Sequence, residues 1–382
     1  MGGTTAASTA GTTVGDVLRV LERHYPLGTA EPWDAVGLVC GDPAAPVGAV
    51  LFTVDLTPAI VDQARELGVQ LVVAHHPLLL KGIHAVDVRH PKGRMLTELI
   101  TAGIAVYCAH TNADVGPTGT VAALADALGL VDTRPLRATG GTRLDKIITF
   151  VPDDHVQPVV DALAAAGAGA IGDYDRGYFV TPGTGSFRPL AGSHPYLGTA
   201  REVEQVAEHR LEMIMPRPAR SAVLAALRAV HPYEAPAYDV IELAPEPTGS
   251  GLGRVGRLTE PTTLQGFAVR VRAALPAWPA GIRVAGDPER AVSTVAVQAG
   301  AGDDLLDAAR EAGADVYLTS DLRHHPASEA LAWAGAPALV DVSHWAAEWT
   351  WLPVAERLVL DDLSVRTEVS RICTDPWTAL VR

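Results

Sequence analysis

Two adjacent histidines, His75 and His76, are the residues whose type and position most clearly suggest chemistry. They follow the apolar run Leu71 to Ala74, which is typical of a strand buried on both faces of a parallel sheet. Such a strand delivers its side chains to a functional site at its carboxyl end, and Pro77 ends this one. Because neutral imidazole is the commonest transition-metal ligand, the pair predicts either a metal site or two ordinary loop histidines.

Polar side chains also follow the next predicted strand, residues 104–109. His110 and Asp114 come directly after it and are expected at the same sheet edge as His75. Asp114 is a candidate partner of the histidine pair, although it could also be an N-cap or turn residue before a helix near 121–128. We interpret His110 as a residue that orients a metal-binding imidazole or contacts a substrate.

The second half of the chain weakly repeats the first. Residues 309–318 correspond to residues 64–73 in the order and spacing of a helix end, a glycine and a strand. This correspondence predicts two related half-domains around one sheet or cleft. After the repeated strand the second half has Asp321 where the first has the histidine pair, so Asp321 is a further candidate for contact with a metal-binding residue or a substrate.

His344 and Glu348 follow the last predicted buried strand, residues 338–342. If a helix begins after Ser343 as its N-cap, the spacing of four places both side chains on one face. Taken alone the pair is a weak indication, because most such pairs are solvated helix faces.

Together the strand ends supply three imidazoles and two carboxylates, and no thiolate. The candidate ligands are His75, His76, Asp114, His344 and Glu348. This mixture suits Zn²⁺, Mn²⁺, Fe²⁺ or Ni²⁺. Five ligands exceed what one catalytic zinc ion normally takes from a protein, so we expect two divalent ions that share a carboxylate.

A unit of a different kind interrupts the two halves. Its expected elements are a strand at 145–151, a helix at 155–166, a strand at 210–215, a helix at 219–230 and a strand at 236–242. Alternating strands and helices elsewhere indicate an α/β core with largely parallel sheets, whereas this pattern resembles a ferredoxin-like α+β insertion. The predicted organisation is a flexible tail at 1–13, the two halves of the metal-binding core at 14–142 and 246–382, and the insertion at 143–245.

Composition limits the function classes. The 382 residues carry a net charge of −14, which disfavours nucleic-acid binding. Three cysteines without close spacing indicate a reducing cytoplasm, and neither a signal peptide nor a membrane span is expected. The run Gly251 to Gly256 matches a dinucleotide fingerprint by its letters. We reject that match, because the run follows a Pro/Gly linker instead of joining a strand to a helix.

These residues resemble the Nif-three-like dinuclear-metal family, whose members are often named GTP cyclohydrolase 1 type 2 homologues. The resemblance covers nearly the whole chain and rests on several short motifs. They are Trp33-Asp34-x-x-Gly37-Leu38, Ala74-His75-His76-Pro77-Leu78, Ala109-His110-Thr111-Asn112-x-Asp114, Gly183-Thr184-Gly185-x-Phe187-Arg188-Pro189, His231-Pro232-Tyr233-Glu234-x-Pro236-Ala237-Tyr238-Asp239 and His344-x-x-x-Glu348.

The resemblance implies that the five candidate residues are the metal ligands. Glu348 would contact both ions, with His75 and Asp114 on one ion and His76 and His344 on the other. Long members of the family carry an insertion similar to PII-like and CutA-like trimeric domains and form hexameric toroids, so a homohexamer of two trimers is expected. The chain departs from the family at two bulky residues, Trp345 and Trp349, which are predicted to narrow the cleft.

Two functions are compatible with this sequence. The first is a metal-dependent hydrolase that acts on a nucleotide or another small phosphorylated molecule, because two divalent ions suit an anionic substrate. The second is a non-catalytic hexamer that binds, delivers or senses metal. The sequence assigns no separate general acid.

Overall fold

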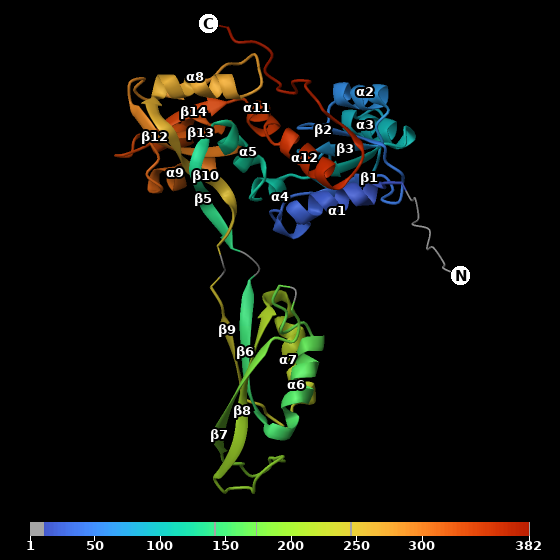
Figure 1. Ribbon diagram of the computed structural model, residues 1–382, viewed down its shortest axis with the longest axis vertical. Helices are drawn as coiled ribbons and strands as arrows, with labels where there is room; N and C mark the ends of the chain where they lie inside the picture. The colour runs from blue at the N-terminus through green and yellow to red at the C-terminus, as the bar shows by residue number, and fades with distance from the viewer. Residues whose placement is uncertain (1–10, 141–142, 173, 245–246, 382) are drawn as a thin grey trace, which may run out of the picture. The chain divides into compact units, whose positions relative to one another are not determined.

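The computed structural model describes residues 11–140, 143–172, 174–244 and 247–381 (Figure 1). The chain forms two compact units, one from the residues up to Thr139 together with those from Gly249 onward, the other from Gly140 to Thr248. Residues 1–10 of the predicted tail lie outside the described residues. Thr13, which the prediction also placed in the tail, instead caps helix α1 (Val14–His24), because its hydroxyl accepts a hydrogen bond from the backbone N–H of Asp16.

The first sheet of the larger unit has the strand order β1-β4-β3-β2-β15. Its strands are β1 (Gly37–Cys40), β2 (Ala49–Thr53), β3 (Leu71–Ala74), β4 (Ala105–Cys108) and β15 (Arg366–Val369). All pairings are parallel except that of β1, and every residue of β2, β3 and β4 is buried. Helices α2 (Pro58–Leu67) and α3 (Pro91–Thr101) pack on one face, and α1 and α12 (Leu352–Asp362) on the other (Figure 1). The predicted buried parallel sheet is confirmed.

The second sheet has the order β11-β14-β13-β12-β10-β5. Its strands are β5 (Leu130–Gly140), β10 (Pro247–Thr263), β11 (Arg283–Ala285), β12 (Ala291–Ala301), β13 (Val316–Ser320) and β14 (Ala338–Val342). The remaining α-helices of the larger unit are α4 (Thr111–Asp114) and α5 (Thr120–Ala127) from the first half of the chain, and α8 (Leu264–Ala274), α9 (Leu306–Glu311), α10 (His324–Leu331) and α11 (His344–Trp349) from the second. One apolar core contains residues of both sheets, among them Phe52 and Val73 from the first and Val297 and Val340 from the second.

The two halves exchange a strand, which the sequence did not predict. β5 comes from the first half of the chain and lies at the edge of the second sheet, whereas β15 comes from the C-terminal part and pairs in parallel with β2 of the first sheet. The exchange adds backbone hydrogen bonds between the halves to their shared apolar core. The halves are therefore related in element order but are not separate sequential bodies.

The smaller unit has the order β-α-β-β-α-β, which is one strand more than the five elements that the sequence predicted. Its elements are β6 (Leu144–Pro152), α6 (Val156–Ala165), β7 (Tyr178–Phe187), β8 (Glu204–Pro216), α7 (Arg220–Val230) and β9 (Tyr238–Glu242). The sheet order is β7-β8-β6-β9, all antiparallel, and both helices contribute to a core with Ile147, Leu211 and Met213.

Strand β7 was missed in the sequence prediction. Its central residues, Thr181 to Ser186, include one proline and two glycines and look like a turn. β7 lies at the edge of the sheet, where a proline removes no ladder hydrogen bond that the fold needs. The long partner strand β8, not the local sequence, therefore determines that this segment is extended.

The rejected dinucleotide fingerprint lies inside β10 and does not join a strand to a helix. Its glycines allow β5 to approach closely: a side-chain carbon at Gly251 would lie 2.3 Å from the carbonyl oxygen of Arg137. Gly253 also has a positive φ of 61°, which an L-residue rarely adopts.

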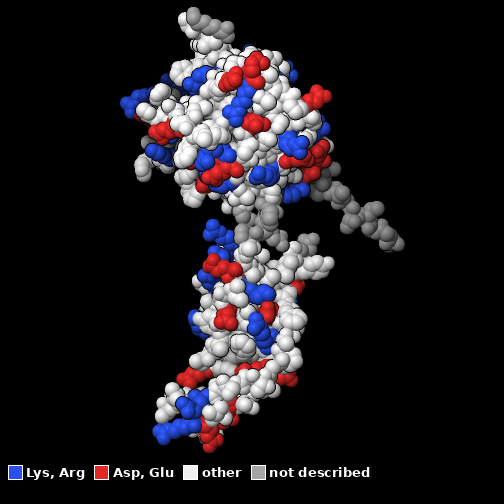
Figure 2. Space-filling model, turned by 90° about the vertical axis from the view of Figure 1, so that its left-hand side faces the viewer, with Lys and Arg blue, Asp and Glu red and all other residues white. Residues whose placement is uncertain are grey.

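Acidic and basic side chains are interspersed on the face shown in Figure 2. This mixture differs from the single-sign patch that nucleic-acid binding favours. Among the described residues, no helix is both long enough and apolar enough to cross a membrane.

Candidate metal centre

His75 and His76 lie directly beyond the carboxyl end of β3, as predicted. The chain stays paired with the end of β2 and the residue after it, because the backbone N–H of His75 donates to the carbonyl of Thr53 at 3.0 Å and that of His76 donates to the carbonyl of Val54 at 2.9 Å. These bonds hold both backbones while the two side chains turn toward α11. The imidazole centroids are 5.0 Å apart, so the rings face a common space.

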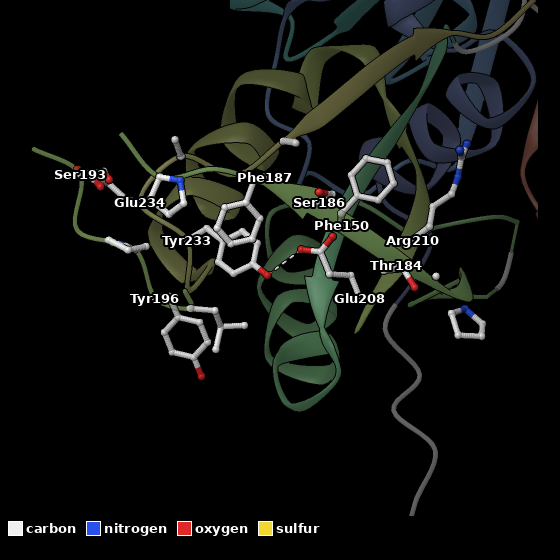
Figure 3. A pocket seen from close by; sticks show the side chains of 18 of the residues that line it. Phe150, Thr184, Ser186, Phe187, Ser193, Tyr196, Glu208, Arg210, Tyr233 and Glu234 are labelled. Carbon is white, nitrogen blue, oxygen red and sulfur yellow. Dashed lines mark hydrogen bonds between the residues drawn. The ribbon is translucent and has the colours of Figure 1, made fainter. Parts of the chain in front are cut away.

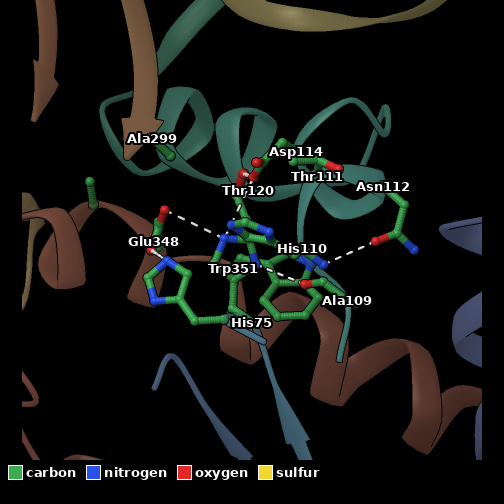
Figure 4. Close-up of polar contacts among 12 residues, drawn as sticks. His75, Ala109, His110, Thr111, Asn112, Asp114, Thr120, Ala299, Glu348 and Trp351 are labelled. Carbon is green, nitrogen blue, oxygen red and sulfur yellow. Dashed lines mark hydrogen bonds and ion pairs between the residues drawn. The ribbon is translucent and has the colours of Figure 1, made fainter. Parts of the chain in front are cut away.

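Glu348 faces the imidazole of His75 (Figure 4) and also contacts those of His76 and His344. Ser343 caps α11 by accepting a hydrogen bond from the backbone N–H of Ala346 at 3.2 Å, which confirms the predicted N-cap. The Glu348 carboxylate is only 2% exposed. Its Oε1 lies 2.9 Å from Nε2 of His344 and 3.4 Å from Nε2 of His75, and its Oε2 lies 3.0 Å from Nε2 of His76.

The second ring nitrogen of each histidine at the site has a hydrogen-bond acceptor. The Nδ1 pairs are His75 with the carbonyl of Ala109 at 2.8 Å, His76 with Asp55 at 2.7 Å, His344 with Asp321 at 2.6 Å and His110 with Asp34 at 2.9 Å. A carbonyl or a carboxylate can only accept, so Nδ1 carries the hydrogen and the lone pair of a neutral ring is on Nε2. Such outer partners are typical of metal-binding histidines.

The charges within the cluster shift its proton equilibria strongly. Burial lowers the pKa of His76, but Glu348 and Asp55 outweigh it and raise that pKa to about 10. Burial also lowers the pKa of His344, which Glu348 and Asp321 raise to about 11. Burial raises the pKa of Glu348, yet the three surrounding imidazoles hold it well below its usual range. The carboxylate therefore stays ionised, and its negative charge favours a proton or another cation at the neighbouring Nε2 atoms.

Asp114 lies at the edge of this cluster. Its Oδ1 is 3.7 Å from Nε2 of His75 and accepts a hydrogen bond from the hydroxyl of Thr120. Burial raises the pKa of Asp114, and nearby His75 lowers it, with a net rise. The alternative interpretation as a helix N-cap is wrong, because Gly119 occupies that position in α5.

The imidazole of His110 lies next to those of His75 and His76. Its ring centroid lies 5.2 Å from that of His75 and 5.4 Å from that of His76. Burial lowers the pKa of His110. Among the described residues, two groups of side chains could each hold a metal ion, because the ligand atoms within each group all lie within 4.8 Å of one another. One group is His75, His76 and His110, and the other is His76, His344 and Glu348.

Three residues of the site were missed by the sequence prediction. Asp55 follows the buried strand β2, and the strand-end rule that selected His75 could have found it. Gly300 is close to the cluster, because a side-chain carbon there would lie 2.6 Å from Oε1 of Glu348. Trp351 is fully buried with its ring 5.5 Å from that of His75, and its indole N–H donates to the hydroxyl of Tyr25 at 3.0 Å. No sequence pattern near Gly300 or Trp351 indicates that either residue belongs to the site.

A cleft of about 600 Å³ opens beside His76 and His344. Asp321, Arg283 and Trp377 also line it. Of the two tryptophans of α11 that were expected to narrow the cleft, only Trp345 lines it, and the narrowing itself stays a prediction. Trp345 lines the cleft, whereas Trp349 does not and donates its indole N–H to the carbonyl of Ser370 at 2.8 Å.

Comparisons with known proteins agree with this architecture. Residues 12–376 match the family described as Duf34/NIF3 (NGG1p interacting factor 3). The GTP cyclohydrolase 1 type 2 homolog of Mycobacterium tuberculosis is 47% identical over 95% of this chain and 96% of its own length, and that of Bacillus subtilis is 36% identical over 95% and 98%.

Solved structures of relatives cover the whole fold. A Bacillus cereus protein related to NIF3 is 34% identical with a TM-score of 0.67, covering 96% of this chain and 98% of its own. The Staphylococcus aureus protein SA1388 is 27% identical with a TM-score of 0.78, covering 97% and 99%. The resemblance found in the sequence is thereby confirmed, and this chain belongs to the Duf34/NIF3 family.

Proposed function

We propose that this protein binds two divalent metal ions and uses them to hydrolyse a nucleotide or another small phosphorylated molecule. The observation that carries the proposal is the convergence of three imidazole Nε2 atoms on the buried carboxylate of Glu348. The Nε2 atoms of His76 and His344 are only 3.2 Å apart. When both rings are neutral their lone pairs oppose each other, and a cation between them would relieve that repulsion.

The donor set fits the proposed ions. The proposed ligands are His75, His76, Asp114, His344 and Glu348. The buried Nε2 of His75 has no hydrogen-bond partner in the described chain, so it is available as a ligand. Imidazole and carboxylate donors without thiolate suit Zn²⁺, Mn²⁺, Fe²⁺ or Ni²⁺. A pair of such ions supplies Lewis-acid chemistry and activates water.

The residues around the cluster have separate tasks in this proposal. Asp55 and Asp321 fix the ring orientation of His76 and His344 through hydrogen bonds of 2.7 and 2.6 Å. Arg283 lines the cleft and can reach an anionic group of a substrate, although it pairs with Asp341 at 2.6 Å. The exposed ring of Trp377 offers a stacking surface for a planar base. The relatives carry the name GTP cyclohydrolase 1 type 2 homolog, so GTP belongs among the substrates to be tested.

A non-catalytic role in metal storage or delivery is the second candidate. It is favoured by the acidic cleft lining, where Asp55, Asp321, Asp341 and Asp375 accompany the single arginine, Arg283. Such a lining attracts cations more readily than phosphates. A delivery protein should release its ions to a chelator within minutes, whereas an enzyme should retain them.

An activity screen over GTP, other nucleotides and phosphodiesters tests the enzymatic proposal. We expect turnover by metal-loaded protein and a loss of more than about 100-fold in His76→Ala, since removal of an outer partner alone typically costs 10–100-fold. His324→Ala is the matched control, because His324 lies on α10 outside the cluster. Turnover that is equal in His76→Ala and wild type would exclude catalysis at this site.

We also propose that the chain assembles as a homohexamer of two trimers. The smaller unit exposes several large apolar side chains, among them Tyr174, Phe179, Leu190 and Val203, which contact with other copies of the chain would remove from water. Multi-angle light scattering at micromolar concentration is expected to give the mass of six chains. A mass of one chain under these conditions contradicts the proposal.

A further inference from the structure

The smaller unit contains a cavity of about 610 Å³, a volume typical of small-molecule sites (Figure 3). Strand β7, the segment after it and the loop between α7 and β9 line this cavity. All of its lining residues fall between Phe150 and Ala237, so the cavity is complete within this unit.

A buried carboxylate lies in the cavity wall. Glu208 of β8 is 9% exposed and accepts one hydrogen bond, from the hydroxyl of Tyr233 at 2.7 Å (Figure 3). Among the described residues it has no ion-pair partner. Gly185 leaves room for it, because a side-chain carbon there would lie 1.9 Å from Oε2 of Glu208. A buried carboxylate without a cation is costly unless another group compensates it.

The other charged residues of the lining do not neutralise Glu208. Arg210 donates from its Nε to Glu212 at 2.8 Å. Glu234 accepts from the backbone N–H of His194 at 3.0 Å and adds a second negative charge. The three charged lining side chains, Glu208, Arg210 and Glu234, therefore leave the cavity with a net charge of −1, which favours a cationic occupant.

Four aromatic rings line the same cavity as the carboxylate. Phe187 and Tyr233 have their ring centroids 6.0 Å apart, and Tyr196 lies 6.3 Å from Tyr233. Phe150 lines the cavity beside Glu208 (Figure 3). A cation over the face of such rings is attracted by their quadrupoles. If the cation has N–H groups, a nearby carboxylate can also accept hydrogen bonds from them.

We propose that this cavity binds a small organic cation with N–H donors, an ammonium or a guanidinium group. Glu208 is the counter-ion, and the rings of Phe150, Phe187, Tyr196 and Tyr233 form the walls. The proposal does not depend on the metal centre or on catalysis.

Calorimetric titration of the full chain tests this site with three probes. Agmatine presents a guanidinium and an ammonium group, cadaverine presents ammonium groups only, and choline is a cation without N–H donors. We expect saturable binding of agmatine, cadaverine or both, at least about tenfold tighter than that of choline, because N–H bonds to a carboxylate are charge-assisted. The difference between agmatine and cadaverine shows which head group the cavity prefers.

Glu208→Gln should weaken binding at least about tenfold, because it keeps an acceptor for Tyr233 but removes the charge. Glu242→Gln is the matched control, since Glu242 is exposed in the same unit and does not line the cavity. Tyr196→Leu removes one exposed ring without disturbing the core and should weaken binding several-fold, which provides a test even if Glu208→Gln does not fold. No saturable binding of agmatine or cadaverine below about 1 mM overturns the proposal. So does unchanged binding in folded Glu208→Gln or, where that variant does not fold, unchanged binding in Tyr196→Leu.

Discussion

Glu348→Ala is expected to lower the metal content of the purified protein from the proposed two ions per chain to nearly none. Its two oxygens contact different imidazoles, Oε1 those of His75 and His344, and Oε2 that of His76. A carboxylate can bind two ions with its two oxygens, whereas an imidazole gives one nitrogen to one ion. Without Glu348, two cations would also repel each other without a protein anion between them. Elemental analysis by mass spectrometry measures the result directly.

The comparison variant for this experiment is His344→Ala. It removes one imidazole and is expected to empty mainly one position, with about one ion per chain remaining. If Glu348 were only a residue of a solvated helix face, its loss would cost a few tenths of a kcal/mol and no metal. Its 2% exposure already disagrees with that view. Retention of two ions by Glu348→Ala together with loss of both by His344→Ala would show that the bridging assignment is wrong.

Gly300→Ala is expected to damage the site from the backbone side. Gly300 has a φ of 78°, and a side-chain carbon there would lie 2.6 Å from Oε1 of Glu348 and 3.2 Å from Nε2 of His344. The carbonyl of Gly300 accepts a hydrogen bond from the hydroxyl of Thr319 at 2.9 Å, which limits how far this backbone can retreat. We expect a loss of about 1–3 kcal/mol in the free energy of unfolding and a fall in metal affinity of at least about tenfold.

Gly313→Ala is the control that separates the effect of backbone strain from the effect of steric contact with the metal ligands. Gly313 also has a positive φ, 70°, but an added side-chain carbon there has no neighbour within 4 Å. It should therefore lower the melting temperature through backbone strain while leaving metal affinity unchanged. Chelator competition and thermal unfolding of both variants provide the two measurements. Wild-type metal affinity in Gly300→Ala, or an equal loss of affinity in Gly313→Ala, would contradict the assigned role of Gly300.

Several features of this protein are determined by short stretches of sequence. The continuous apolar run of β3 is buried along its whole length, and His75 and His76 follow it directly, because a strand covered on both faces needs apolar side chains at every position. Ser343 caps α11, which places His344 and Glu348 on one helix face. These features depend on hydrogen bonds and burial patterns within a few residues, so they can be predicted locally.

Other features were decided by the tertiary structure alone. His76 and His344 are separated by 268 positions in the chain, yet their Nε2 atoms are 3.2 Å apart. The exchange of β5 and β15 between sheets and the extended conformation of β7 depend on partner strands that are distant or unusually long. Pairing between strands is specified by the burial of whole faces, and no single segment encodes it.

The environment of each site residue was also decided by the tertiary structure. Asp55 reaches His76 because β2 and β3 are neighbours in a parallel sheet, and Asp321 reaches His344 from the end of β13. The sequence shows that polar residues follow strands that end at one edge of a sheet, but it does not show which carboxylate contacts which imidazole. Those pairings set the distances and charges that raise the pKa of His76 to about 10, and distances between side chains exist only once the sheets have packed against one core.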